Sequence, residues 1–301
     1  MQSNFTYDYP HCEFPFEEWN PVQAKCLPFF TEDMNLVVSA TVASGKTAIA
    51  EAIMAYEISS NKGKAIYASP LKALSLEKAE NWAKHPTFSK FKIALLDGDH
   101  NTSREDLESA DLVIATVEAL DVCAKHRANW LEKAKALVFD ETHLLGQGDR
   151  GACAEAMLME FTAFNPSARV ICLSGTMGNA REIASWLKLL NGKRTSFLAS
   201  EWRPSKLTKK AVALDGLDKQ FKHIEKSIIE GPYDKVLVFV HSKKIGKLLC
   251  ERLRHCGIRC GFFHSALNPA TKEKLALAFK DAANDLNVLI ATSSLAMGVN
   301  L

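Results

Sequence analysis

The chain has 301 residues and a mass of 33.2 kDa, above the usual size of one domain, so we expect two domains. Apolar residues make up 47% of the chain and charged residues 24%, a globular composition that excludes a disordered protein. The net charge is +2, but residues 1–200 carry 20 Lys and Arg against 25 Asp and Glu, whereas residues 201–301 carry 17 against 10. This asymmetry favours a polyanionic partner for the C-terminal part, and a solvated basic face explains it equally well.

Short apolar runs rich in Val and Ile alternate with longer amphipathic stretches through the first two thirds of the chain. Apolar runs without polar alternation are typical of parallel strands that helices cover on both faces. The predicted strands are Asn35–Ala40, Lys64–Ser69, Phe91–Leu96, Asp111–Thr116, Ala134–Asp140 and Arg169–Ser174. The predicted helices are residues 46–60, 71–84, 117–126, 151–163 and 179–190.

A polar stretch that begins at Glu201 interrupts this pattern, which then restarts. The later predicted strands are Lys235–Val240, Cys260–His264 and Asn287–Ala291, and the later predicted helices are residues 217–230, 243–255 and 269–282. We therefore predict an α/β protein with two tandem, doubly wound parallel-sheet domains, residues 1–200 and 217–301, joined by a linker over 201–216. The second domain stops just after a strand, so we expect it to be incomplete.

The segment from Ala40 to Thr47 follows the first predicted strand and opens the first long helix. It matches the phosphate-binding loop pattern, with Ala40 in place of the first Gly. A Gly in this loop permits a tight turn, so that successive amide N–H groups converge on phosphate oxygens at a helix N-terminus. The lysine then supplies charge for the β- and γ-phosphates, and the threonine hydroxyl is a predicted Mg²⁺ ligand. The predicted nucleotide-binding residues here are Ala43, Ser44, Gly45, Lys46 and Thr47.

The sequence Phe139-Asp-Glu-Thr-His143 ends another apolar strand. Because adjacent parallel strands end on the same edge of a sheet, we expect its carboxylates to face the phosphate loop. Asp140 would then hold Mg²⁺ through water, and Glu141 would polarise the attacking water. A polar turn in which Asp140 or Thr142 caps a helix is the structural alternative.

Eight cysteines are scattered along the chain and form no C-x-x-C pair. Small buried thiols in a reducing compartment explain this distribution, and we predict no structural metal. The sequence contains neither an apolar run of the about 20 residues that span a bilayer nor the pattern of a signal peptide at its start. We therefore expect an intracellular protein, cytoplasmic or associated with the nucleoid or nucleus, that has no membrane partner.

Further motifs follow one another in the order of a known family. They are Trp19–Gln23, Ala68–Leu74, Ala115–Leu120, Leu173–Met177, Val236–Ser242 and Ile290–Asn300. From about residue 14 to residue 301 the sequence resembles superfamily 2 DExH-box helicases. Within them it looks most like the Ski-like group, which includes archaeal replication-fork DNA helicases and the helicase domain of polymerase theta. The resemblance implies two RecA-like domains that ATP binding closes and hydrolysis reopens.

The resemblance also implies roles at the nucleotide site. Gln23 would hydrogen-bond the adenine edge, and Gly298 and Asn300 of the second domain would face the nucleotide. His143 would link the nucleotide site to motion, although a packed polar residue is the alternative for it. The implied catalytic residues are Lys46, Asp140, Glu141 and His143.

The remaining motifs imply nucleic-acid contacts and coupling. Ser174 and Thr176 lie in the family's coupling motif, in which Gly175 stands where Ala is usual. The residues expected on the nucleic-acid backbone are Pro70, Lys72, Thr116, Glu118, His241, Ser242 and Thr292. Helix starts and strand ends are the structural alternative for these positions other than Thr292.

In the family, the motif after Gly-Val-Asn-Leu carries arginines that reach the nucleotide, and this sequence stops at Leu301, before it. We therefore expect weak hydrolysis by this chain alone unless a further region or chain supplies those arginines. The predicted function is an ATP- and Mg²⁺-dependent helicase or translocase core on single-stranded or forked nucleic acid, with 3′→5′ movement. DNA is favoured over RNA. The alternatives are an RNA helicase of the same group and a non-catalytic module that binds nucleotide and nucleic acid.

Overall fold

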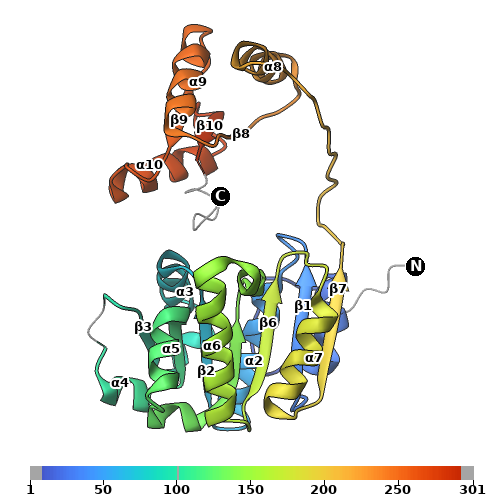
Figure 1. Cartoon of the computed structure of the whole chain (residues 1–301), viewed down its shortest axis with the longest axis vertical. Coiled ribbons are helices and arrows are strands. Elements are labelled where there is room, and N and C mark those ends of the chain that lie inside the picture. The colour runs from blue at the N-terminus through green and yellow to red at the C-terminus, as the bar shows by residue number, and fades with distance from the viewer. Residues whose placement is uncertain (1–8, 100–101, 293–301) are drawn as a thin grey trace. The chain divides into compact units, whose positions relative to one another are not determined.

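A computed structural model describes residues 9–99 and 102–292 of the chain. The chain divides into two compact units, Met1–Lys206 and Leu207–Leu301. In each unit helices pack on the two faces of a parallel sheet (Figure 1). The prediction of two α/β units with parallel sheets is therefore confirmed.

The first unit is built on a seven-stranded sheet with the strand order β3-β4-β2-β5-β6-β1-β7, and its paired strands run parallel. Parallel neighbours need a crossover connection, and helices supply it here. The strands are β1 (Asn35–Ala40), β2 (Lys64–Ser69), β3 (Ile93–Leu96), β4 (Leu112–Thr116), β5 (Ala134–Phe139), β6 (Arg169–Ser174) and β7 (Thr195–Ser200).

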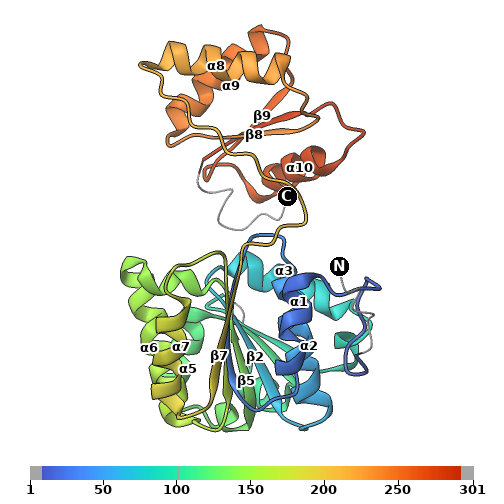
Figure 2. The same ribbon diagram turned by 90° about the vertical axis from the view of Figure 1, so that its right-hand side faces the viewer.

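Helices cover both faces of this sheet. Figure 2 shows α1, α2 and α3 on one face and α5, α6 and α7 on the other. The helices are α1 (Pro21–Cys26), α2 (Lys46–Ser59), α3 (Lys72–Ala83), α4 (Arg104–Ser109), α5 (Val117–Lys125), α6 (Gly148–Phe164) and α7 (Ala180–Asn191). Short 3₁₀ turns span Leu27–Phe29, Phe88–Lys90, Asn129–Lys133 and Thr142–Gly146.

The central strands bury both of their faces, which explains their mainly apolar sequences. In β1, Leu36 and Val38 pack into the core under α2, whereas Val37 packs into the core on the opposite face. Full burial of each such side chain contributes about 1.5–3 kcal/mol to folding. The two cores fix the strand ends, and the strand ends carry the motif residues.

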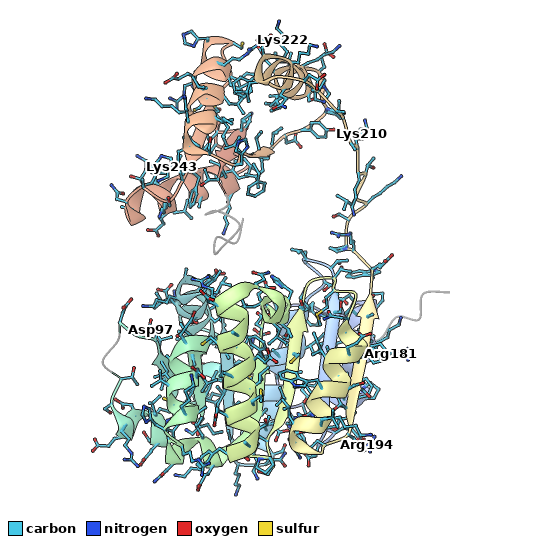
Figure 3. The ribbon with its side chains drawn as sticks, in the orientation of Figure 1. Asp97, Arg181, Arg194, Lys210, Lys222 and Lys243 are labelled. Atoms are coloured by element: carbon cyan, nitrogen blue, oxygen red, sulfur yellow. The ribbon has the colours of Figure 1, made fainter. Side chains whose placement is uncertain are left out.

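The second unit has a three-stranded parallel sheet with the order β8-β10-β9. Alternate residues of β10 again face two clusters, since Val288 and Ile290 pack with Phe221 and Leu249, whereas Leu289 packs with Phe279. Its elements are α8 (Leu217–Glu230), β8 (Val236–Phe239), α9 (Lys243–His255), β9 (Cys260–Phe263), α10 (Pro269–Lys280) and β10 (Val288–Ala291). Residues 201–216 form no helix or strand, and Lys210 lies within this extended segment (Figure 3).

Most predicted elements lie within two residues of the observed ones, and β1, β2 and β6 match to the residue. Helix α6 begins three residues before its predicted start, at Gly148. The sequence interpretation missed β7, whose mixed Thr-Ser-Phe-Leu-Ala-Ser sequence pairs with β1 as an edge strand of intermediate exposure. It also missed the short helices α1 and α4, whose starts are capped by Asn20 and Ser103.

All eight cysteines are free, and the Sγ atoms of Cys250 and Cys260 lie 3.3 Å apart in the second unit. Within residues 9–99 and 102–292, no three or more His, Cys, Asp or Glu side chains gather in a way that could hold a metal ion. In the same ranges no helix has both the length and the apolar character that a membrane crossing needs.

A buried ion pair fastens the amino end of β6 to α2. Arg169 and Glu57, whose side chains are 1% and 5% exposed, lie 2.6 Å apart (Nε to Oε1). The same guanidinium donates to the carbonyl oxygens of Phe29 at 3.0 Å and Phe30 at 2.6 Å. Burial lowers the pKa of Arg169, and Glu57 opposes this effect. The pair also holds the segment that follows α1.

We expect Arg169→Met to destabilise the first unit by about 3–5 kcal/mol, because the buried Glu57 would lose its cation and the carbonyl groups of Phe29, Phe30 and Glu32 would lose their donor. Chemical denaturation followed by tryptophan fluorescence measures the loss. Arg104→Met is the matched control, since that side chain is 70% exposed, and its effect should stay within about 0.5 kcal/mol. Equal effects of the two substitutions would contradict this account of the pair.

Candidate nucleotide-binding site

The loop between β1 and α2 has the backbone of an anion cradle. Ala43 and Gly45 both have positive φ, at 62° and 75°, and α2 begins at Lys46. Such alternation makes a concave nest of N–H groups at a helix N-terminus. The φ of 75° strains any other residue at position 45, and a Cβ there would also lie 2.3 Å from Nε2 of Gln23. The hydroxyl of Ser44 is buried there and has no hydrogen-bond partner among residues 9–99 and 102–292.

The ammonium of Lys46 is held inside the mouth of this loop. Its Nζ donates to the carbonyl oxygens of Ala40 and Thr41, both at 2.9 Å. Burial lowers the pKa of Lys46, and the charges of Glu141 and Asp140 oppose that effect. The lysine is therefore a pre-positioned cation whose present acceptors are neutral carbonyl groups that phosphate oxygens can replace.

Asp140 and Glu141 follow β5 on the carboxyl edge of the sheet. Tyr67 of β2 donates its hydroxyl to Oδ2 of Asp140, and the amide of Glu141 donates to Oδ1 at 2.9 Å. Glu141 has a φ of 53°, a left-handed conformation that costs a non-glycine residue about 1–3 kcal/mol. Burial and the charge of Asp140 raise the pKa of Glu141. Strand β6 lies between β5 and β1, so these carboxylates are not on the strand next to the phosphate loop.

His143 connects Glu141 to the end of β6. Its Nδ1 lies 3.2 Å from Oε2 of Glu141 and 3.4 Å from Oγ of Ser174. The amide of His143 also donates to Oγ of Ser174 at 3.2 Å. The structure therefore brings together two catalytic candidates, Glu141 and His143, and one coupling candidate, Ser174. Thr176 is exposed two residues further on.

Gln23 lies against the phosphate loop. Its Nε2 donates to the carbonyl of Gly45 at 3.2 Å, and its Oε1 accepts from the amide of Asn20 at 3.1 Å. Asn20 in turn caps α1 and donates from Nδ2 to the carbonyl of Ser44 at 3.0 Å. These hydrogen bonds hold the backbone of the phosphate loop at Ser44 and Gly45. Recognition of adenine by Gln23 stays a prediction.

The expected nucleic-acid residues of the first unit lie together on the carboxyl edge. Strands β2 and β4 pair Ser69 with Thr116, which places the residues after both strands side by side. Thr116 caps α5 by accepting from the amide of Ala119 at 3.3 Å. Lys72 is exposed and lies 2.7 Å from Oδ2 of Asp99. Pro70 is buried, and Glu118 is exposed in the first turn of α5.

The second unit repeats this arrangement on its own carboxyl edge. Strand β10 pairs Ala291 with Phe239 of β8 and with Phe263 of β9, so the three strands end together. Ser242 caps α9 by accepting from the amide of Ile245 at 3.3 Å, and the exposed His241 precedes it. Lys243 begins α9 (Figure 3). Thr292 follows β10, and Gly298 and Asn300 lie outside the described residues.

The sequence interpretation missed Tyr67 and Lys78, which contact the candidate site residues Asp140 and Thr47, and it missed Trp82, which packs against both Tyr67 and Lys78. Lys78 of α3 donates from Nζ to Oγ1 of Thr47 at 3.2 Å. Trp82 donates from Nε1 to Oε1 of Glu51 at 2.6 Å. Tyr67 sits inside an apolar strand, and the other two residues follow an expected nucleic-acid motif. No local pattern marks them, because these contacts arise through tertiary packing.

A cradle at the start of α2, a lysine inside it and two carboxylates on the same sheet edge are the features of a phosphate-loop protein of the RecA-like α/β class. The chain belongs to the DEAD/DEAH box helicase family. The model of that description matches residues 20–183, and the helicase conserved C-terminal domain matches residues 219–301.

The predicted similarity to archaeal DNA helicases is also confirmed. The chain is 38% identical over 194 residues to the ATP-dependent DNA helicase Hel308 of Thermococcus kodakarensis. This alignment covers 64% of this chain and 16% of the relative. It is 30% identical over 288 residues to Hel308 of Methanococcus vannielii, which covers 91% of this chain and 36% of the relative. The chain thus spans less than half the length of these curated relatives.

Among solved structures, the chain is similar to the S. cerevisiae protein Dbp5 in its complex with Gle1 and IP6, with a TM-score of 0.68. The likeness covers 95% of this chain and 72% of that one, at 19% sequence identity. At this identity the likeness shows the fold.

We expect Lys46→Ala to weaken the binding of nucleoside triphosphate by about 2–4 kcal/mol, because a charge-assisted contact to the phosphates is lost. Isothermal titration calorimetry with a non-hydrolysable ATP analogue measures the effect. Lys84→Ala, at the exposed C-terminal end of α3, is the matched control. Unchanged affinity in Lys46→Ala would remove this lysine from the site.

Proposed function

We propose that the chain is the ATP-hydrolysing motor core of an ATP-dependent DNA helicase. The observation that carries the proposal is the anion cradle of Ser44 to Lys46, set on the same sheet edge as Asp140 and Glu141. The names of the curated relatives, ATP-dependent DNA helicases at 30–40% identity, support both the nucleotide and the nucleic acid. ATP and nucleic acid as substrates also imply action inside the cell.

The phosphates of ATP would occupy the cradle. The buried Ser44 hydroxyl lacks a partner within the described residues, and a phosphate oxygen would supply an acceptor for it. Lys46 would exchange its two carbonyl acceptors for β- and γ-phosphate oxygens, and the loop amides would complete the contact. Gln23 and Asn20 keep the loop in shape from the opposite side.

The donor set at the cradle suits Mg²⁺. Thr47 offers a hydroxyl oxygen, and Asp140 offers a carboxylate that two donors already orient. Hard oxygen ligands of this kind, together with waters and phosphate oxygens, are what Mg²⁺ requires in such sites. When bound there, Mg²⁺ would neutralise charge on the β- and γ-phosphate oxygens.

Glu141 would orient the attacking water. Its raised pKa brings the carboxylate nearer to the basicity that a general base needs, and His143 lies 3.2 Å from its Oε2. Ser174 touches the same imidazole, so a change at Glu141 is passed to the end of β6 through one side chain. We propose this path for coupling hydrolysis to movement.

Single-stranded DNA would lie along the carboxyl edges of the sheets. In the first unit the exposed Lys72 follows β2, beside Thr116 at the end of β4. In the second unit His241 and Ser242 follow β8, and Thr292 follows β10. Binding of this kind is to the sugar–phosphate backbone and carries no base readout. We propose 3′→5′ movement on a single or forked strand.

ATP turnover in the presence and absence of a single strand tests the function. A DNA motor should be stimulated by a DNA oligonucleotide more than by RNA of the same sequence. Stronger stimulation by RNA would indicate an RNA helicase of the same family. Binding of ATP and strand without any turnover would indicate a passive binding module and would contradict the proposal.

We expect Glu141→Gln to lower ATP turnover by roughly 10²–10⁴ while ATP binding persists, because the amide keeps the size of the side chain and loses the base. Steady-state phosphate release and calorimetry with the same preparation measure the two quantities. Parallel loss of binding and turnover would assign Glu141 to the structure of the site or to metal binding instead.

Strand binding should depend steeply on salt. Lysines such as Lys72 would neutralise DNA phosphates and release their counterions, so log Kd should rise linearly with log salt. Fluorescence anisotropy between about 50 and 200 mM salt measures the slope. Lys72→Met should reduce the slope by about one counterion, and Lys84→Met should leave it unchanged. A flat salt dependence would show that the exposed basic side chains do not face the strand.

A further inference from the structure

Helix α3 contacts both of the sites proposed above for the first unit. Its first residue is the exposed Lys72, directly after the motif expected on the nucleic acid. Six residues later, Nζ of Lys78 donates to Oγ1 of Thr47 at 3.2 Å. Thr47 is the second residue of α2 and a candidate Mg²⁺ ligand. Helix α3 therefore carries a lysine at the proposed nucleic-acid site and a second lysine that contacts a hydroxyl at the proposed nucleotide site.

The position of Lys78 is fixed from several sides. The half-buried ammonium lies 5.8 Å from the centroid of the Trp82 ring, one turn along α3. Trp82 is 1% exposed and donates to Oε1 of Glu51 at 2.6 Å. Glu51 follows Thr47 by one turn of α2, and burial raises its pKa while Trp82 and Lys78 oppose the rise. Two residues of α3 thus contact two residues of α2.

The same helix packs against Tyr67, which holds the second candidate metal ligand, Asp140. The rings of Trp82 and Tyr67 meet edge to face, with centroids 4.9 Å apart and planes at 88°. Tyr67 is 1% exposed and donates its hydroxyl to Oδ2 of Asp140. The position of α3 therefore influences both Thr47, through Lys78, and Asp140, through Trp82 and Tyr67.

The first turn of α3 also contacts the ends of β4 and β3, which lie at the proposed nucleic-acid site. Ser75 is buried, and its Oγ donates to the carbonyl of Ala115 at 3.5 Å, one residue before Thr116. Lys72 pairs with Asp99, which follows β3. A DNA phosphate that replaces Asp99 as the partner of Lys72 would pull on the first turn of α3. Because the rest of α3 is packed in the core, a small shift of the helix would move its neighbours as well.

We propose that Lys78 is a positioning residue that couples nucleic-acid binding at the start of α3 to the orientation of the Thr47 hydroxyl. The proposal rests on the proposed function, since it requires both ligands. The hydroxyl that accepts from Lys78 keeps one lone pair and one proton, which are left with the two other directions around its oxygen. A shift of α3 re-aims them. Coupling of this kind is reciprocal, so nucleotide also changes the affinity for the strand.

The test is a binding cycle measured on the whole chain. Fluorescence anisotropy gives the Kd of a labelled single-stranded DNA with and without saturating non-hydrolysable ATP analogue and Mg²⁺. The ratio of the two values is the coupling factor. The variants are Lys78→Met, which removes the ammonium, and Lys78→Gln as a second neutral side chain. Lys78→Arg keeps the charge, and Lys84→Met is the exposed control near the end of the same helix.

In both neutral variants the coupling factor should move toward 1 by about 2- to 30-fold. Stimulation of ATP turnover by the strand should fall in parallel, while the melting temperature stays near that of the parent chain. Lys78→Arg should retain most of the coupling, and Lys84→Met all of it. A purely structural role would lower the melting temperature and leave the coupling factor of the folded protein unchanged.

Two failures are distinguishable. A parent chain in which strand and nucleotide bind without any coupling or stimulation would contradict the proposed function, and the role of Lys78 with it. A parent chain that is coupled, with neutral variants that keep the same factor, would overturn the role of Lys78 and leave the proposed function intact.

Discussion

The site depends on a charge that the protein holds ready inside a tight loop. Lys46 sits half-desolvated at the start of α2 and donates to two carbonyl groups of the chain that leads into it. An unpartnered ammonium at that depth would be costly, so the loop must keep these carbonyls in reach. The left-handed turns at Ala43 and Gly45 make that possible, and the Gln23 side chain packed against Gly45 keeps them in place. Asp140 and Glu141, which follow β5, therefore interact with a cation whose position is fixed.

The sequence predicts the central parts of this architecture well, and the reason is burial. Strands β1, β2 and β6 are covered on both faces and consist mainly of apolar residues with few polar ones, so their limits are visible without a structure. Edge strand β7 is half exposed and mixes polar with apolar residues, so its pairing with β1 is decided by tertiary contact. The positions of the motif residues can also be predicted, because the loops that follow parallel strands all lie at the carboxyl edge of the sheet.

The supporting residues are invisible in the sequence for a different reason. Tyr67 reads as one more apolar residue of β2, yet its hydroxyl holds the carboxylate of Asp140. Lys78 reads as a solvated helical lysine, yet its ammonium meets Thr47 across the gap between two helices. Both roles arise from side chains 31 to 73 residues away in the chain, and only packing brings them together. A motif locates a site, whereas the partners that tune the site are distributed over the core.

The two lysines that would meet phosphate groups differ in one physical respect, which is burial. Each already has an acceptor within the protein: carbonyl oxygens for Lys46 and the carboxylate of Asp99 for Lys72. Phosphate binding at either is therefore an exchange of acceptors. At the half-buried Lys46 the exchange is partly shielded from bulk water, where charge-assisted bonds are stronger and mobile ions screen less. At the exposed Lys72 both partners are solvated and screened, so the exchange costs little in either direction. The proposed motor would hold its nucleotide through chemistry and release its track at every step. The difference in burial suits both tasks, because one lysine lies inside a loop and the other at the start of a helix.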